Sequence, residues 1–138
     1  MKTIICHLLF LVVALSLNHQ TDAAAAEVSK KAVQECIKEG GLNGDDTKRI
    51  MADELFSPKH KETSEKLQCF LLCCYKKLGL IAADGKQNPE AAIKYLQQRY
   101  ADKKDKIKPA LAKCANIKNS NPCSLIYEFE GCILKNIM

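Results

Sequence analysis

The stretch that decides the fold covers residues 69–80 and reads Cys-Phe-Leu-Leu-Cys-Cys-Tyr-Lys-Lys-Leu-Gly-Leu. At about 100° per residue, the apolar side chains of this region share one helical stripe: Leu67, Phe70, Leu71, Cys74 and Leu78. Cys69 and Cys73 lie one turn apart on a roughly opposite face, where they cannot easily bond each other and need different partners. We expect a helix that is packed on one side, cross-linked on the other and central to the fold.

Six cysteines form a widely spaced set, with 32, 3, 40, 8 and 8 residues between neighbours: Cys36, Cys69, Cys73, Cys114, Cys123 and Cys132. Three disulfides that close loops of this size would each contribute on the order of 3–4 kcal/mol. That is large against a typical total stability of about 5–15 kcal/mol, so a cross-linked fold of this kind can keep part of its interior empty. The pairing of the cysteines does not follow from their spacing alone.

The N-terminal region predicts secretion. Lys2 precedes an almost wholly apolar run over residues 4–17, and four alanines follow at 23–26. This is the pattern of a cleaved signal peptide, and the run is shorter than the roughly 20 residues of a membrane-spanning helix. We therefore predict a signal peptide over residues 1–26 and a single soluble, extracellular domain over residues 27–138. Such an environment favours disulfide formation.

The mature region predicts an all-α fold of six helices without a sheet. The expected helices cover residues 28–39, 47–55, 62–78, 89–100, 106–118 and the region from 122 onward. The pairs Asn88-Pro89 and Asn121-Pro122 are strong start signals, because Asn caps a helix and Pro suits its first position. A glycine pair at 40–41 and Gly79 mark two helix ends.

The last predicted helix is suited to forming the wall of a cavity. Its apolar stripe consists of Leu125, Ile126, Phe129, Ile133 and Ile137. Cys123 and Cys132 are nine residues apart, which places them about 180° apart around the helix axis. Each is therefore expected to bond a different neighbouring helix.

Charge and composition argue against several classes of function. The formal net charge is +5, and the densest basic stretch, residues 102–108, contains acids among its lysines. We predict no nucleic-acid partner, since no basic patch with aromatic residues is present. His60 is the only histidine outside the signal region, and no neighbour completes a catalytic pair, so we predict no enzyme activity. A metal site at Cys69, Cys73 and Cys74 is disfavoured by secretion, and no metal or cofactor is expected.

These residues resemble one known family, the insect odorant-binding proteins of the six-cysteine type. The resemblance rests on the spacing of the six cysteines and on the sequence over 69–80, and it covers nearly the whole mature chain. It implies disulfides Cys36–Cys73, Cys69–Cys123 and Cys114–Cys132. It also implies six helices around an apolar cavity that carries odorants, pheromones or similar small hydrophobic molecules through extracellular fluid, with delivery to an odorant receptor or a membrane surface.

The sequence departs from the family pattern at two places. Cys74 is an extra cysteine, for which three interpretations remain: a buried free thiol, an intermolecular disulfide in a dimer, or a replacement of Cys73 in its bridge. A monomer with a free thiol is the favoured interpretation. Only six residues follow Cys132, fewer than the long C-terminal segment that enters the cavity in some moth members. With His60 alone in a predicted loop, a histidine-driven release switch has little support.

The ligand contacts are inferred from the apolar stripes. We predict the cavity wall at Phe70, Leu71, Cys74, Leu111, Leu125, Ile126, Phe129 and Ile133. Weaker candidates are Phe56, Ile93 and Leu96, and hydroxyl contacts are assigned to Tyr95 and Tyr127. Each of these residues is also compatible with an ordinary filled core. The alternative function is therefore a disulfide-stabilised protein-interaction module, an inhibitor or effector, with no cavity.

Overall fold

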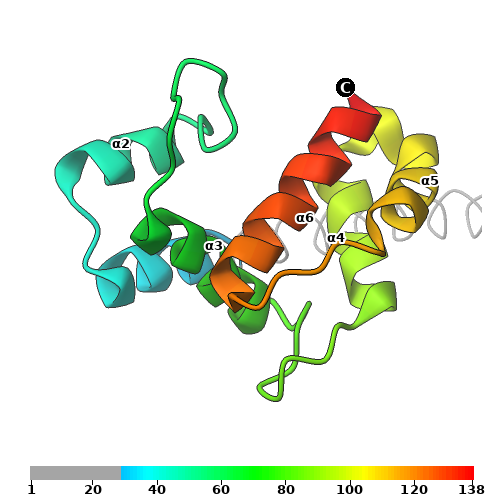
Figure 1. Ribbon diagram of the computed structural model, residues 1–138, viewed down its shortest axis with the longest axis horizontal. Helices are drawn as coiled ribbons and strands as arrows, with labels where there is room; N and C mark the ends of the chain where they lie inside the picture. Colours follow the sequence, from blue (N-terminus) through cyan, green and yellow to red (C-terminus); the bar gives the residue numbers. More distant parts are fainter. Residues whose placement is uncertain (1–28) are drawn as a thin grey trace, which may run out of the picture.

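The fold is built only from helices over the residues that the structure describes. The structure is a computed structural model and describes residues 29–138. Six α-helices follow one another: a first helix over 29–40, α2 (Gly44–Met51), α3 (Glu65–Lys77), α4 (Pro89–Arg99), α5 (Lys104–Cys114) and α6 (Pro122–Ile137). A short 3-10 helix, η1 (Ala101–Lys103), leads into α5, and this part of the chain contains no strand. The predicted all-α fold class is confirmed (Figure 1). The predicted signal peptide, residues 1–26, lies outside the described residues.

Side-chain caps determine where four of the helices begin. Asn43, Ser64, Asn88 and Asn121 each accept a hydrogen bond from a backbone N–H two or three residues further on. The predicted starts at Asn88 and Asn121 are confirmed. The starts of α2 and α3 were predicted at residues 47 and 62, each three residues away from the observed start, because Asn43 and Ser64 provide the caps.

Two predicted helix ends are also corrected. The second helix ends at Met51 instead of Leu55, because Asp53 takes a left-handed conformation with φ of 55° that cannot continue the helix. The fifth helix covers 104–114 instead of 106–118. Its last residue, Cys114, is bonded to Cys132, and the following segment crosses directly to the N-cap of α6. Gly79, at φ 71°, ends α3 as predicted.

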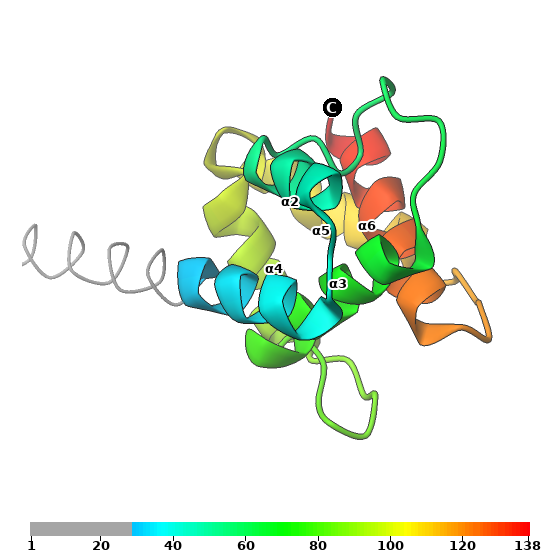
Figure 2. The same ribbon diagram turned by 90° about the vertical axis from the view of Figure 1, so that its left-hand side faces the viewer.

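Helix α6 lies between the two core clusters, and α3, which is bonded to both the first helix and α6, is cross-linked on one side and packed on the other as expected. Helix α6 runs across the middle of Figure 1 with α3 on one side and α5 on the other, and its most extensive helix contacts are with these two. The first helix and α2 lie at the end of the molecule that faces the viewer in Figure 2. Ile126 of α6 belongs to a core cluster built around α3, whereas Phe129, Ile133 and Ile137 belong to a second cluster with α4 and α5. A helix with apolar contacts on two sides joins the two halves of the core.

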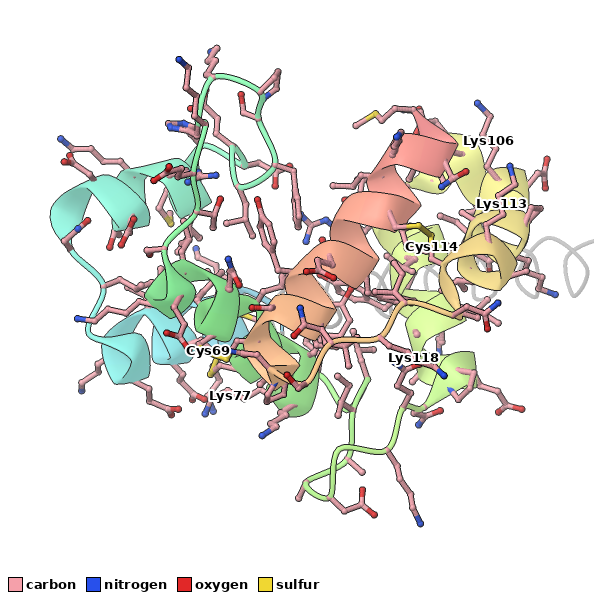
Figure 3. All side chains as sticks on the ribbon, in the orientation of Figure 1. Cys69, Lys77, Lys106, Lys113, Cys114 and Lys118 are labelled. Carbon is pink, nitrogen blue, oxygen red and sulfur yellow. A yellow bond between two sulfur atoms is a disulfide. The ribbon has the colours of Figure 1, made fainter. Side chains whose placement is uncertain are left out.

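Three disulfides connect the helices. Cys36–Cys73 joins the first helix to α3, Cys69–Cys123 joins α3 to α6, and Cys114–Cys132 joins α5 to α6. These are the pairs that the family resemblance implied. Cys69 and Cys114 lie on opposite sides of α6 in Figure 3, as expected for partners of two cysteines that are about 180° apart around the axis of that helix.

The segment between α2 and α3 is held by one buried arginine, Arg49. Its guanidinium group donates to the carbonyl oxygens of Glu54 at 3.2 Å, Leu55 at 2.6 Å and Glu62 at 3.2 Å, and to the hydroxyl of Thr63 at 2.8 Å. A planar guanidinium with several N–H groups suits this role, because one side chain satisfies carbonyls from both ends of the segment. The cationic side chain therefore replaces the regular backbone hydrogen bonds that this irregular segment lacks.

Candidate ligand-binding cavities

The first cavity has a volume of about 190 Å³ and lies between α3, α4, α5, α6 and the loop after α3. Its walls are formed by Tyr75, Leu80, Ile81, Gln87, Pro89, Ala92, Ile93, Leu111, Ala115, Ile126 and Phe129. Tyr75, Leu80, Ile81, Ile126 and Phe129 are buried and form an inner, almost wholly apolar surface. The exposed residues Gln87, Pro89 and Ala115 mark its mouth. A cavity with an apolar interior and an accessible rim is suited to a small hydrophobic molecule.

The second cavity is smaller, about 130 Å³, and lies on the other side of Tyr75 among the first helix, α2, α3, α4 and α6. Its walls are formed by Ser29, Val33, Ile50, Asp53, Leu55, Phe70, Leu71, Cys74, Tyr75, Leu78, Tyr95, Arg99 and Glu130. Tyr75 is the only one of these residues that also lines the first cavity. The second cavity differs chemically from the first, because charged and hydroxyl-bearing side chains are part of its wall.

Two buried polar side chains of the second cavity, Glu130 and Tyr75, have no well-aligned hydrogen bond among the described residues. Both carboxyl oxygens of Glu130 and the hydroxyl of Tyr75 are inaccessible and make no bond of standard geometry. Burial raises the pKa of Glu130, and the positive charge of Arg99 opposes that shift only in part. Burial, followed by the nearby charge of Glu130, also raises the pKa of Tyr75. A side-chain hydrogen bond between the Tyr75 hydroxyl and the Glu130 carboxyl group also contributes, lowering the pKa of Glu130 and raising that of Tyr75, although its geometry is not well aligned.

Cys74 is a free thiol that faces this same cavity. Burial, followed by the charge of Glu130, raises its pKa to about 12. Because the thiolate is the reactive form, this thiol is a weak nucleophile in the folded protein. Its position favours the buried free thiol among the three interpretations of the extra cysteine.

At the edge of the second cavity, Arg99 is partly exposed, with 35% of its side chain accessible. Its guanidinium donates to the hydroxyl of Tyr95 at 3.0 Å and to a carboxylate oxygen of Asp53 at 3.0 Å. Arg99 and Asp53 therefore form a bonded pair at the rim, and Tyr95 is already engaged. Glu130 and Tyr75 remain the polar groups without a well-aligned hydrogen bond.

Comparison with known proteins places the chain in a family. A model of the PBP/GOBP family matches residues 18–136. The chain belongs to this family. General odorant-binding protein 19d of Drosophila melanogaster is 30% identical to it over 107 residues, which are 75% of this chain and 67% of that protein. The resemblance drawn from the cysteine spacing is confirmed.

Solved structures share the fold of this PBP/GOBP family member. The fatty acid binding protein OBP56a from the oral disk of the blowfly Phormia regina superposes with a TM-score of 0.62 at 23% identity, covering 80% of this chain and 89% of that one. Apis mellifera odorant binding protein 5 superposes with a TM-score of 0.63 at 16% identity, covering 82% and 88%. Family and fold together support the class of small hydrophobic ligand carriers.

The residues predicted to contact ligand in this PBP/GOBP protein fall into three groups. Leu111, Ile126 and Phe129, with the weaker candidate Ile93, line the first cavity. Phe70, Leu71 and Cys74, with Tyr95, line the second cavity. The structure places the remaining candidates in neither cavity: Leu125, Ile133, Leu96, Phe56 and Tyr127.

Packing explains where the remaining candidates lie. Ile133 and Leu96 are fully buried in the second core cluster, and Leu125 is half-buried. Phe56 stacks on Tyr127 with ring centroids 4.8 Å apart, and the Tyr127 hydroxyl is hydrogen-bonded to Thr63 at 2.9 Å. Thus Tyr127 stabilises the segment before α3, and its hydroxyl is already bonded there.

Sequence reasoning missed Glu130 and Tyr75, although a signal for Glu130 was present. Glu130 lies four residues after Ile126 and three before Ile133, which places it inside the apolar stripe of α6. An acid at such a position is forced into the core when that stripe is buried. Tyr75 carried no comparable signal, because a tyrosine beside an apolar stripe is compatible with surface or core.

Other types of site have little support in residues 29–138. No group of three or more His, Cys, Asp or Glu side chains is placed to hold a metal ion within this range. His60 lies on the segment before α3, where it contacts Glu54 at 3.4 Å, and it lines neither cavity. Within the same range, no helix is both long and apolar enough to cross a membrane. Lys113 projects outward from α5 in Figure 3 and lines neither cavity.

Proposed function

We propose that the protein is a secreted carrier that binds small hydrophobic molecules and transports them through extracellular fluid. The observation that carries this proposal is the first cavity, with its buried apolar wall and its exposed mouth. The N-terminal sequence pattern supports secretion, and the family supports the ligand class. The blowfly neighbour, which is named as a fatty acid binding protein, has the same fold.

The size of the first cavity favours compact ligands. An apolar cavity of about 150 Å³ in another protein binds benzene, and the first cavity is somewhat larger, at about 190 Å³. Binding is driven by the apolar ligand surface removed from water, at about 25 cal/mol per Å², less the cost of ordering the ligand. Micromolar affinity and moderate selectivity follow from a wall that offers few polar contacts.

The proposal is tested by filling the first cavity. Ala92→Phe introduces a ring into the cavity wall, whereas Ala112→Phe places the same ring on an exposed position of α5 that lines neither cavity. Displacement of an apolar fluorescent probe is measured for both variants and the native protein. Tryptophan is absent, so intrinsic emission interferes little.

We expect saturable micromolar binding by the native protein and by Ala112→Phe, and a loss of at least about tenfold in Ala92→Phe. Equal binding by Ala92→Phe and the native protein would show that the probe binds elsewhere. No saturable binding by the folded, three-disulfide native protein would favour the interaction module with a filled core. A thiol titration in denaturant accompanies the measurement, and we expect one free thiol, from Cys74.

A further inference from the structure

We propose that the ring of Tyr75 sets the length of the ligands that the protein carries, because it separates two cavities that would otherwise form one continuous space. This inference rests on the carrier function proposed above and adds the residue that selects among ligands by size. The first cavity holds the ligand, and Tyr75 forms the inner end of the space that the ligand chain can occupy.

The first argument is the position of Tyr75 in the walls of both cavities. It is the only residue that the two walls share. Along α3 and the loop that follows, Leu78 lines the second cavity, whereas Leu80 and Ile81 line the first. Tyr75 is 4% exposed, so its ring lies inside the molecule. One buried aromatic side chain therefore lies against both spaces.

The second argument is that two further helices contribute to both walls with residues that are close in sequence. On α4, Ile93 lines the first cavity and Tyr95 lines the second. On α6, Phe129 lines the first cavity and Glu130 lines the second. The two walls therefore adjoin on three helices, α3, α4 and α6, and the cavities are neighbours within one interior.

The third argument is that Tyr75 is held in place from two sides. Its backbone carbonyl accepts hydrogen bonds from the N–H groups of Leu80 at 2.9 Å and Ile81 at 3.4 Å, at the end of α3. Its hydroxyl is directed to the Glu130 carboxyl group of α6, in a hydrogen bond that is not well aligned. The ring therefore extends from α3 toward α6. In a closely packed interior, such a ring is a fixed part of the wall.

The volumes of the two cavities predict a length limit. A cavity of about 150 Å³ holds benzene, so the first cavity, at about 190 Å³, has room for about six to eight carbon atoms. The second cavity, at about 130 Å³, has room for several more. Beyond Tyr75, its wall includes the apolar side chains of Phe70, Leu71 and Leu78. A chain that passes the position of the ring would therefore bury further apolar surface.

The test is a series of unbranched 1-alkanols from butanol to decanol, titrated into the oxidised protein with dissociation constants measured by NMR. The hydroxyl group of each alkanol can remain in water at the exposed mouth beside Gln87. Tyr75→Ala and Tyr75→Leu remove the ring, and Tyr75→Phe keeps it. Phe70→Ala is the matched control, because it removes an aromatic ring that lines the second cavity only.

In the native protein, we expect affinity to rise about fourfold with each methylene group, up to about seven carbons, and then to level off. In Tyr75→Ala and Tyr75→Leu, the rise continues for at least about two further carbons, so that nonanol binds at least about tenfold more tightly than to the native protein. Tyr75→Phe and Phe70→Ala keep the native limit. Circular dichroism establishes that each variant is folded, and Tyr75→Leu provides the decisive comparison if Tyr75→Ala does not fold.

A second readout locates the bound chain. Leu71 lines only the second cavity, whereas Leu111 and Ile126 line only the first. Nuclear Overhauser effects between bound nonanol and these methyl groups are measured in the native protein and in Tyr75→Leu. We expect contacts with Leu111 and Ile126 in both proteins, and contacts with Leu71 only in the variant. This pattern distinguishes two joined cavities from a general loosening of the core.

The failure of this inference is distinguishable from the failure of the carrier function. The same length limit in Tyr75→Ala, Tyr75→Leu and the native protein, with the alkanols and the fluorescent probe still bound, would overturn the role of Tyr75 and leave the carrier standing. Contacts between nonanol and Leu71 in the native protein would also overturn it, as would a longer limit in Tyr75→Leu without those contacts. A limit in Tyr75→Phe or Phe70→Ala as long as that of Tyr75→Ala would do the same. No binding of any alkanol or probe would overturn both proposals.

Discussion

The two charged side chains buried within residues 29–138, Arg49 and Glu130, have opposite surroundings. Arg49 is 9% exposed and donates four hydrogen bonds to the segment between α2 and α3. Glu130 is 1% exposed and lies in the wall of the second cavity, where its nearest polar partner is the Tyr75 hydroxyl and no hydrogen bond of standard geometry is formed among the described residues. Arg49 therefore makes several hydrogen bonds to the backbone and side chains around it, whereas Glu130 makes none of standard geometry.

This difference bears on stability. A buried charge that makes several hydrogen bonds recovers much of its loss of hydration through those bonds. A buried carboxyl group without a well-aligned hydrogen bond is a net cost to the folded state. Arg49 and Glu130 therefore predict mutational effects of opposite sign.

The largest effect is expected from Arg49→Met. The substitution keeps the length of the side chain but leaves the carbonyls of Glu54, Leu55 and Glu62 without their donor. We expect the free energy of unfolding in urea to fall by about 2–4 kcal/mol. Lys48→Met, at an exposed neighbouring position of α2, is the control and should stay within about 0.5 kcal/mol of the native protein. If Arg49→Met lost no more stability than Lys48→Met, the hydrogen bonds of Arg49 would not be what stabilises the segment between α2 and α3.

A smaller effect of opposite sign is expected from Glu130→Gln. Because burial raises the pKa of Glu130 in the folded state, the native protein binds this proton more tightly than the unfolded chain. The stability linked to Glu130 is fully present below its ordinary pKa, about 4.3, and is lost as the pH rises through the raised value. A glutamine at this position cannot ionise, so its stability does not fall as the pH rises. We therefore expect Glu130→Gln to be more stable than the native protein at pH 7 by on the order of 1 kcal/mol.

The measurement is urea unfolding of both proteins between pH 4 and pH 8. The stability of the native protein should fall relative to Glu130→Gln across this range, and the two should converge at the acidic end. Glu128→Gln, on the exposed side of α6, is the control and should follow the native curve. Parallel curves for the native protein and Glu130→Gln would mean that Glu130 gains a partner in solution.

The smallest effect is expected from Thr63→Val. The Thr63 hydroxyl accepts from Arg49 at 2.8 Å and contacts the Tyr127 hydroxyl at 2.9 Å. Valine removes that hydroxyl while three other bonds of Arg49 remain, so we expect a loss of about 0.5–1.5 kcal/mol. Thr63→Ser keeps the hydroxyl and should lose less. A loss as large as that of Arg49→Met would show that Thr63 determines the position of the arginine.

Much of the fold was predictable because its signals are local. Asn88-Pro89 and Asn121-Pro122 marked helix starts through the geometry of the first turn, and Gly79 marked an end through its left-handed conformation. The starts of α2 and α3 were misplaced by three residues, since several polar residues in each approach were able to act as caps. The structure shows that Asn43 and Ser64 are the residues that cap α2 and α3.

The cavity wall was predicted in part. An apolar stripe states which face of a helix is buried but not whether the buried face meets a cavity or a neighbouring side chain. Phe129 lines the first cavity, whereas Ile133, one turn further along the same stripe, is packed without a gap in the second core cluster. The difference depends on the lengths and positions of α4 and α5, which no residue of α6 encodes.

The class of fold, the family and the helix faces that carry the cysteines are readable from the sequence, because helical periodicity is local to each helix and the cysteine spacing is a property of the linear chain. Only the packing of the helices determines that the interior is divided on either side of Tyr75, that Glu130 has no well-aligned hydrogen bond, and that Arg49 makes four. These features depend on which side chains from distant helices meet. Such contacts arise only when all the helices are packed together.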